Sequence, residues 1–500
     1  MDVAPLADAP AGTANATPVA AMAAANLTDF TGLDNVVDRR IPALPGELLR
    51  NMHGFSSPAE GSATVQARMR RRISPLLDRL RGSDTGKAAG LAGAMIANNV
   101  LALVASVVFA RLLTNYIALA ALISYLVILT VAGQAVQVAT AREGVLGRLG
   151  TGEELLATLE RWARALAVFT VLATVVSILA RQPIADAVGV PRQGWAAAAG
   201  IPAGCLYLGL CTLRGALQGI GDYRTVGLSL IGEQAVRLVS GAILAVVGFG
   251  IAGAYLGSLI SYIVMSAYCV FVIYAKLAGP TYQRWRLRST ATAALSFSRH
   301  IWTAAVPITA LAIIQLLQNV DLITAKHQFS AKVGSSYAVA AVAGKVLIWV
   351  AMGASFYLVP ETSRLRAQGA DTRPVLLKSI GIVAVCAVPC MLIFAFGAHP
   401  LLAAVFGKDK AIASSSLLPL GAAFTVLAAT YLAVQYMLAL KRVWFLPAIG
   451  LIAAIEPVLL LQAPKHPASF ATVVLFVQLL GAAVVYAIAL SRRPALARVA

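Results

Sequence analysis

The chain has 500 residues, of which 59% are hydrophobic and only 12% are charged, and its mean hydropathy is +0.80. Soluble proteins carry about 25% charged residues, so this composition excludes a soluble globular protein. The net charge of +19 does not indicate a nucleic-acid partner, because the basic residues lie between long apolar segments, as in the cytoplasmic loops of membrane proteins.

The N-terminal region divides into two parts. Residues 1–64 are rich in Ala, Pro, Gly and Thr and show no hydrophobic period, which predicts a disordered cytoplasmic tail. Residues 65–87 are basic, and their apolar side chains fall near one helical face: Met69, Ile73, Leu76, Leu77 and Leu80. This segment is either an amphipathic helix on an anionic leaflet or a basic flank that only sets membrane topology.

Long uncharged stretches follow. Ala88 to Ala110 contains no Asp, Glu, Lys or Arg, and similar stretches recur as far as Ser491. A helix needs about 20 mostly apolar residues to cross a bilayer. We therefore predict twelve spans, at residues 88–110, 117–141, 160–180, 194–216, 225–248, 250–275, 301–325, 335–360, 376–398, 412–438, 443–463 and 468–491.

The distribution of basic residues predicts the topology. The loops on one side of the twelve spans hold roughly three times as many Lys and Arg as those on the other. This bias places both termini in the cytoplasm and the chain in the cell (inner) membrane. The five cysteines all lie within predicted spans, without metal-ligand spacing, so we predict no metal site.

The spans divide into six plus six. Residues 88–276 form a predicted N-lobe and 301–491 a predicted C-lobe, joined by a cytoplasmic loop at 277–300 and followed by a tail at 492–500. Repeated halves related by an axis along the membrane normal are a common transporter plan. The expected fold is therefore an all-α polytopic membrane protein whose two six-helix lobes are related by a pseudo-twofold axis along the membrane normal.

Several runs of residues together resemble a known family: 214–219 (RGALQG), 222–224 (DYR), 233–241, 248–257, 319–326 and 334–345. Their order is similar to that of the polysaccharide-transporter branch of the multidrug/oligosaccharidyl-lipid/polysaccharide (MOP) flippase superfamily. The chain departs from the usual pattern in its short connection at 112–116 and its long N-terminal tail. The resemblance implies an alternating-access flippase for a polyprenyl pyrophosphate carrying an oligosaccharide, used in cell-surface polysaccharide assembly.

Charged residues inside the spans are candidates for a substrate cavity, because each costs about 2.5–3.5 kcal/mol to insert. Glu233 and Arg237 are four residues apart and share a helical face, so they form either a structural ion pair or a site for an anionic headgroup. Lys345 needs a partner, and Asp321 is the candidate. Glu456, which precedes a proline, is a further cavity candidate.

Polar amides and two basic residues complete the candidate set. Amides suit sugar hydroxyls, although hydrogen bonding between helices explains them equally well. The amide candidates are Gln315, Gln318, Asn319, Asn98, Asn99, Gln134 and Gln137. Arg111 and Lys326 lie near the predicted outer ends of their spans, where they either guide phosphate outward or extend to the interface.

Two other functions compete with the flippase. A cation-coupled multidrug exporter of the same superfamily is disfavoured because the first two spans contain no Asp or Glu. A membrane enzyme is disfavoured because the loop at 276–300 contains no carboxylate. We therefore predict a transporter without a cofactor, coupled to a proton, sodium or membrane-potential gradient, with the bilayer and glycan-assembly enzymes as further partners.

Overall fold

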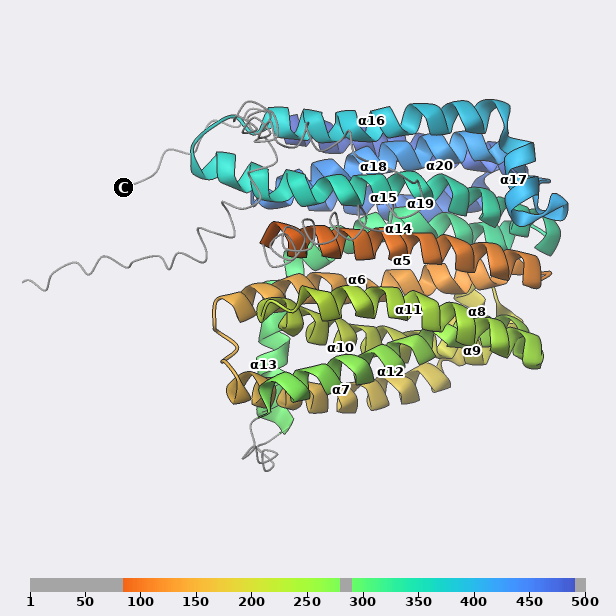
Figure 1. The fold of residues 1–500 in the computed structure, drawn as a ribbon. Coiled ribbons are helices and arrows are strands. Elements are labelled where there is room, and N and C mark those ends of the chain that lie inside the picture. The colour runs from red at the N-terminus through yellow and green to blue at the C-terminus, as the bar shows by residue number, and fades with distance from the viewer. Residues whose placement is uncertain (1–83, 279–289, 491–500) are drawn as a thin grey trace, which may run out of the picture. The chain divides into compact units, whose positions relative to one another are not determined.

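The computed structural model describes residues 84–278 and 290–490, and the elements assigned there are helices (Figure 1). The first group, which we call the N-lobe, contains α5 (Asp84–Leu112), α6 (Tyr116–Val145), α7 (Glu153–Leu179), α8 (Arg181–Val188), η3 (Pro191–Gln193), α9 (Gly194–Ala198), α10 (Gly200–Gly219), α11 (Tyr223–Leu244), η4 (Ala245–Phe249) and α12 (Gly250–Leu277).

A helix of the connecting segment, α13 (Thr290–Thr303), precedes the second group. This C-lobe contains α14 (Ala305–Gln328), α15 (Ala331–Ala367), α16 (Arg373–Phe396), α17 (Ala398–Phe406), η5 (Lys408–Lys410), η6 (Ser414–Ser416), α18 (Leu417–Ala439), α19 (Phe445–Gln462) and α20 (Pro467–Leu490). The two groups lie side by side, with α6 of the N-lobe against α14 of the C-lobe.

The helices are long and apolar enough for a polytopic membrane protein. Eleven stretches of the described residues could each cross a bilayer by length and composition. One of them, Tyr223–Leu277, is 55 residues long and reverses direction at η4, where Gly248 and Gly250 have φ angles of 118° and 50°. Residues that carry a Cβ atom rarely adopt positive φ angles, whereas glycine adopts them readily. Since α11 and α12 pack against each other on either side of this turn, the stretch holds two crossings and the total is the predicted twelve.

The predicted tail at 1–64, most of the basic segment at 65–87 and the tail at 492–500 lie outside the described residues. The predicted inter-lobe loop at 277–300 overlaps α13, a helix that we did not predict and that extends into the start of the predicted span at 301–325.

Contacts with the N-lobe account for α13. Trp162 of α7 donates a hydrogen bond from Nε1 to Ser296 Oγ (2.8 Å), and its ring packs near Phe297 and stacks on His300. The His300 Nε2 atom lies 2.9 Å from the Thr140 hydroxyl. Burial lowers the pKa of His300 more than the negative charge of the nearby Glu143 raises it, so the ring is neutral at pH 7. These tertiary contacts hold this helix against the N-lobe.

Two close helix contacts explain part of the glycine pattern. A Cβ atom added at Gly215 on α10 would lie 2.5 Å from the carbonyl oxygen of Gln137 on α6. One added at Gly257 on α12 would lie 2.7 Å from the carbonyl oxygen of Arg237 on α11. Only glycine permits these approaches, which are typical of helix packing in membranes.

Asp222 holds the turn between α10 and α11. Its carboxylate accepts hydrogen bonds from the backbone and side chain of Thr225 and forms an ion pair with Lys276 at 2.6 Å. Partial burial raises the pKa of Asp222, but the bonds from Lys276 and Thr225 outweigh it and hold the pKa below its ordinary value. The carboxylate is therefore ionised at neutral pH and caps α11.

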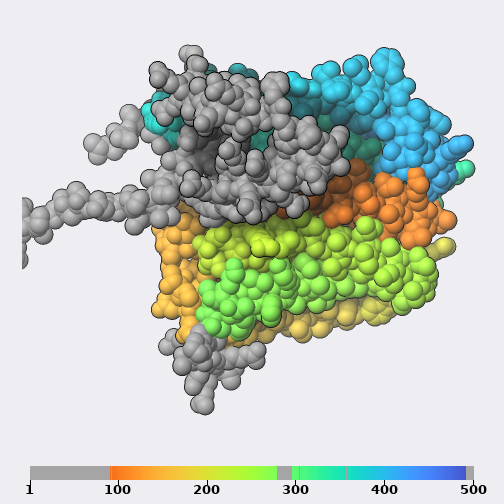
Figure 2. Space-filling model, in the orientation of Figure 1, coloured from red at the N-terminus to blue at the C-terminus, as the bar shows by residue number. Residues whose placement is uncertain are grey.

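The lobes are in contact at the end of the bundle that carries α17, which we call the α17 end (Figure 1). Figure 2 shows atoms of the N-lobe (orange) against atoms of the C-lobe (blue) there. Arg111 at the end of α5 donates to the carbonyl oxygens of Ala404 (2.9 Å) and Val405 (2.7 Å) near the end of α17. Lys410 reaches back to the carbonyl oxygen of Leu113 at 3.4 Å. Each lobe thus places a cation at a helix C-terminus of the other, where the helix dipole favours positive charge.

Two more bonds join the lobes at this end. The backbone N–H of Ile117, in the first turn of α6, donates to Ser335 Oγ of α15 at 3.2 Å. The His327 ring lies 3.1 Å from the carbonyl oxygen of Ala187. Backbone groups that a helix end leaves without a partner are therefore satisfied across the lobe interface, which holds the α17 end together.

Candidate functional site

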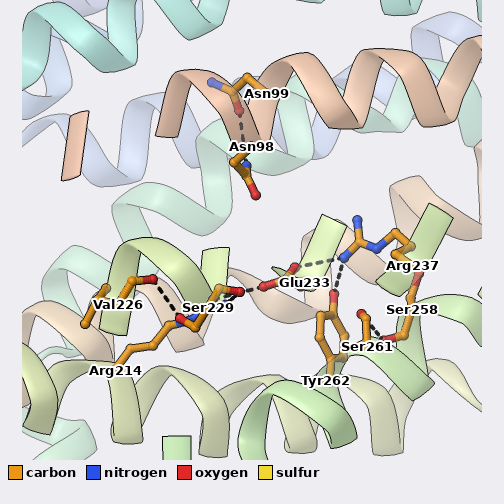
Figure 3. A network of polar contacts seen from close by, with 10 residues as sticks. All are labelled: Asn98, Asn99, Arg214, Val226, Ser229, Glu233, Arg237, Ser258, Ser261 and Tyr262. Atoms are coloured by element: carbon orange, nitrogen blue, oxygen red, sulfur yellow. Dashed lines mark hydrogen bonds and ion pairs between the residues drawn. The ribbon is translucent and has the colours of Figure 1, made fainter. Parts of the chain in front are cut away.

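The N-lobe buries a polar cluster between α10, α11 and α12, which we call the N-lobe network: Arg214, Ser229, Glu233, Arg237 and Tyr262 (Figure 3). Arg214 donates to Glu233 at 2.9 Å and to both the hydroxyl and the backbone carbonyl of Ser229 at 2.8 Å. Arg237 donates to the other carboxylate oxygen of Glu233 and to Tyr262 Oη, both at 3.0 Å. A single carboxylate therefore bridges two guanidinium groups.

The two arginines differ in how far they are satisfied. The Arg214 side chain is fully buried, whereas that of Arg237 is 17% exposed. The Nε atom of Arg237 is buried without a hydrogen-bond partner. Because Glu233 can neutralise only one of the two cations, the network carries an excess positive charge, and Arg237 is the member with donors to spare.

The predicted amides of the first two spans make no hydrogen bond to this network among the described residues. Asn98 and Asn99 on α5 are half-buried, and Asn98 Nδ2 lies 3.4 Å from Asn99 Oδ1. Figure 3 shows Asn98 pointing from α5 toward the side of the network that contains Glu233. On α6, Gln134 is exposed and Gln137 is half-buried.

The C-lobe has its own buried polar cluster, the C-lobe network, built from α14, α15, α19 and α20: Gln315, Asn319, Asp321, Tyr337, Lys345, Glu456 and Gln478. The Lys345 ammonium donates to Asn319 Oδ1 at 3.3 Å and lies 3.8 Å from Asp321 Oδ1. Tyr337 donates to the other oxygen of Asp321 at 3.4 Å. The predicted pairing of Lys345 with Asp321 is thus present as an ion pair.

The acidic groups of this network outnumber its cations. Asp321 and Glu456 are both fully buried, and they interact electrostatically with each other and with Lys345. Gln478 donates to one oxygen of Glu456 at 3.3 Å, while the other oxygen is buried without a hydrogen-bond partner. The amide oxygen of Gln318 is also buried without one. These oxygens are suited to a proton or a small cation.

The two basic residues predicted at the outer ends have structural contacts. The Arg111 guanidinium donates its hydrogen bonds to carbonyl oxygens of α17. The stem of Lys326 is half-buried beside Gly189. Neither residue belongs to the two networks.

Arg214 is the main residue of the N-lobe network that the sequence did not reveal. It was not among the candidate site residues, although it lies inside α10 with its side chain fully buried. Its compensating carboxylate, Glu233, is on another helix, and this pairing could not be read from spacing within one span. The position of Arg214 inside an apolar run was the available signal. No such signal marked Tyr262, Tyr337 or Gln478.

The networks remain separate: across residues 84–278 and 290–490, no hydrogen bond or ion pair joins one to the other. Arg237 and Lys345 therefore do not form a single cationic site in this conformation. Each is paired within its own lobe.

Comparison with known proteins identifies the architecture. The chain matches no protein-family model and no curated protein sequence. It is similar to the solved structure of the lipid II flippase MurJ in an inward closed conformation, with 14% identity over 80% of this chain and 87% of that one (TM-score 0.63). It is also similar to a multidrug resistance MATE family transporter in an inward-facing conformation, with 13% identity over 78% and 93% of the two chains (TM-score 0.62).

A third solved structure, a MOP superfamily transporter from Pyrococcus furiosus, has 15% identity over 83% of this chain and 96% of that one (TM-score 0.51). The similarity extends over most of both chains in all three cases and includes both lobes. Over the described residues the chain therefore shares the helical fold of these solved transporters, and its helices are long and apolar enough to cross a membrane many times.

Proposed function

We propose that this protein is a flippase for a lipid-linked oligosaccharide whose headgroup carries a pyrophosphate. The observation that supports it best is the N-lobe network, where two guanidinium groups face one carboxylate and Arg237 keeps an unused donor. Arginine binds phosphate oxygens through paired N–H groups. A positive site buried between helices offsets the charge of a phosphate as it passes through the hydrocarbon region.

Replacing Arg237 with Ala should stop export of the lipid-linked sugar without loss of protein. Glu233 keeps its bond to Arg214, so the truncation removes two hydrogen bonds and costs about 1–3 kcal/mol of stability, which leaves the fold intact. The measurement is the amount of lipid-linked sugar on the inner leaflet after depletion of the wild type and complementation with the variant.

The matched control is Arg224→Ala, which removes an exposed arginine on the same helix. It should restore export fully. Normal export by Arg237→Ala would contradict the proposed phosphate site, whereas failure of both variants would point to a general loss of the protein.

The C-lobe network is proposed to couple transport to a proton or sodium gradient. With both carboxylates and the Lys345 ammonium ionised, the cluster would hold one excess negative charge buried between helices. Such a state is costly, and binding one proton or one monovalent cation neutralises it. The C-lobe then has two states, one with the proton or cation bound to the carboxylates and one without it.

The Glu456→Gln variant is expected to remove the dependence of transport on the ion gradient. The amide has nearly the shape of the acid and keeps the bond to Gln478, so the network stays packed in its neutral state. Transport by reconstituted protein should no longer change when the proton or sodium gradient is collapsed with an ionophore. A variant that responds like the wild type would show that Glu456 is not the coupling group.

The second candidate is a cation-coupled multidrug exporter, and it is favoured by the similarity to MATE transporters. The charge of the N-lobe network distinguishes the two proposals, because an excess positive charge repels the cationic compounds that such an exporter would carry. Drug efflux that survives Arg237→Ala, together with unaltered glycan export, would favour the exporter.

We also propose that the protein lies in the cell membrane with both termini in the cytoplasm and works beside glycan-assembly enzymes. Cysteines introduced by Arg192→Cys and Arg286→Cys should then react with membrane-impermeant maleimide from opposite faces. Arg192 is exposed, so its substitution leaves the packing unchanged. Labelling of both positions from the same face would refute this topology.

A further inference from the structure

The N-lobe contains an apolar pocket that belongs to neither polar network. It has a volume of about 410 Å³ and lies between α7, α10 and α12, with Phe297 of α13 in its wall. None of the five residues of the N-lobe network lines it. The volume falls in the range of about 300–1,000 Å³ that is typical of small-ligand sites.

The mouth of the pocket opens on the outer surface of the N-lobe. Its lining includes Ala163, Ala167 and Val171 on α7, which are all exposed. The neighbouring positions on α7 are large, apolar and exposed as well, among them Phe169 and Leu172. A face of this composition on a membrane-crossing helix is in contact with lipid, so hydrocarbon rather than water adjoins the pocket.

The two threonines in the wall of the pocket use their hydroxyl groups within their own helices. The Thr170 hydroxyl donates to the carbonyl oxygen of Leu166 at 2.7 Å, and the Thr212 hydroxyl donates to that of Leu208 at 2.9 Å. Both side chains spend their donors on their own helices. Ser266 supplies the remaining hydroxyl of a lining that is otherwise almost entirely apolar. The pocket therefore favours an apolar ligand, and a charged headgroup would have to remain outside it.

Residues in the inner wall of the pocket also contact α13. Trp162 and Phe297 line the pocket and contact each other, with ring centroids 5.4 Å apart. Trp162 also holds Ser296 by a hydrogen bond and stacks on His300. An apolar chain in the pocket would fill space beside the residues that hold the helix linking the two lobes.

We propose that this pocket binds one acyl chain of a bilayer phospholipid and that the bound chain stabilises α13 on the N-lobe. The phospholipid is favoured over the tail of a transported lipid because the pocket opens directly to the bilayer, is small, and is separate from the positively charged network. Filling the pocket restores packing contacts to Trp162 and Phe297, which an empty apolar cavity lacks.

Trp162 supplies a direct probe, because its side chain is only 5% exposed and bulk lipid cannot reach it. The full chain is prepared with Trp162 as the single tryptophan by replacing the others with Phe: Trp195, Trp285, Trp302, Trp349 and Trp444. It is then placed in phosphatidylglycerol vesicles with or without bromine on one acyl chain. Brominated phospholipid should quench the Trp162 emission.

A matched pair of variants tests the location of the chain. Ala163→Phe/Ala167→Phe fills the pocket and should abolish the quenching. Val168→Phe/Leu172→Phe adds the same bulk to exposed positions of α7 that do not line the pocket, and it should be quenched like the parent. Equal quenching of both variants, or no quenching of the parent, would overturn the proposal. Quenching by brominated polyprenol but not by brominated phospholipid would also overturn it.

Hydrogen exchange in the wild-type protein provides the second measurement and needs no variant. Removal of phospholipid in detergent should speed amide exchange in residues 296–303, and adding phosphatidylglycerol back should slow it again. Exchange at the α17 end should not change. If exchange in 296–303 is independent of phospholipid, the bound chain does not stabilise α13 and the proposal fails.

Discussion

Replacing Arg214 with Ala should prevent stable folding, in contrast to the loss of a single function expected for Arg237. The Arg214 side chain is fully buried and makes three hydrogen bonds, one to the Glu233 carboxylate. Breaking a buried ion pair from one side costs about 3–5 kcal/mol, because the remaining partner keeps the cost of burial without its main compensation. The thermal midpoint and the yield of monodisperse protein in detergent measure this effect.

Two further variants make the result specific. Arg214→Lys keeps the charge but loses the planar fork that reaches both Ser229 and Glu233, so its stability should lie between wild type and Arg214→Ala. Arg224→Ala should leave the thermal midpoint unchanged, because an exposed side chain contributes little. An Arg214→Ala protein as stable as Arg224→Ala would show that the buried pair does not hold the N-lobe together.

A disulfide across the α17 end should arrest transport and release it on reduction. An ideal Cβ atom at Gly334 of α15 lies 3.4 Å from the Ile117 Cβ atom of α6. Disulfides span Cβ separations of about 3.5–4.5 Å, so Ile117→Cys/Gly334→Cys needs a shift of only a few tenths of an ångström. Because these positions belong to different lobes, oxidation would hold the lobes together where Arg111 and Lys410 already join them.

The control is a disulfide inside one lobe. An ideal Cβ atom at Gly204 lies 3.2 Å from the Leu129 Cβ atom, and both residues belong to the N-lobe. In a background without Cys205, Cys211, Cys269, Cys386 and Cys390, oxidised Leu129→Cys/Gly204→Cys should still transport. Full transport by the oxidised inter-lobe pair would mean that the α17 end does not open during the cycle.

The two buried networks have opposite charge balance, and this gives the lobes different roles in the proposed mechanism. Two guanidinium groups share one carboxylate in the N-lobe, whereas in the C-lobe Lys345 pairs with Asp321 and the buried Glu456 is a second acidic group without an ion pair of its own. The first arrangement favours an anionic headgroup and the second favours a proton or a cation. The networks make no polar contact with each other across the described part of the chain. Binding at one network would therefore affect the other through the packing of helices between the lobes, such as α6 against α14.

Much of the fold could be predicted from the sequence because the bilayer imposes a strong and local requirement. Each crossing must satisfy its own backbone hydrogen bonds and present apolar side chains over about 20 residues, so the spans are visible one at a time. The i, i+4 pair of Glu233 and Arg237 was visible for the same reason, since it lies within one helix. The pairing of Lys345 with Asp321 could be anticipated because each was nearly alone among apolar residues.

Other features depend on residues that are far apart in the chain, and local patterns do not encode them. The burial of Arg214 requires Glu233 from the next helix, α13 requires Trp162 from α7, and Arg111 requires the carbonyl oxygens of α17. Hydropathy thus establishes that this chain crosses a membrane many times, because transfer into lipid acts on each segment separately. Which of its scarce charges remain free to meet a ligand is settled only when the helices pack, because a buried charge is neutralised by whichever opposite group the fold brings within reach.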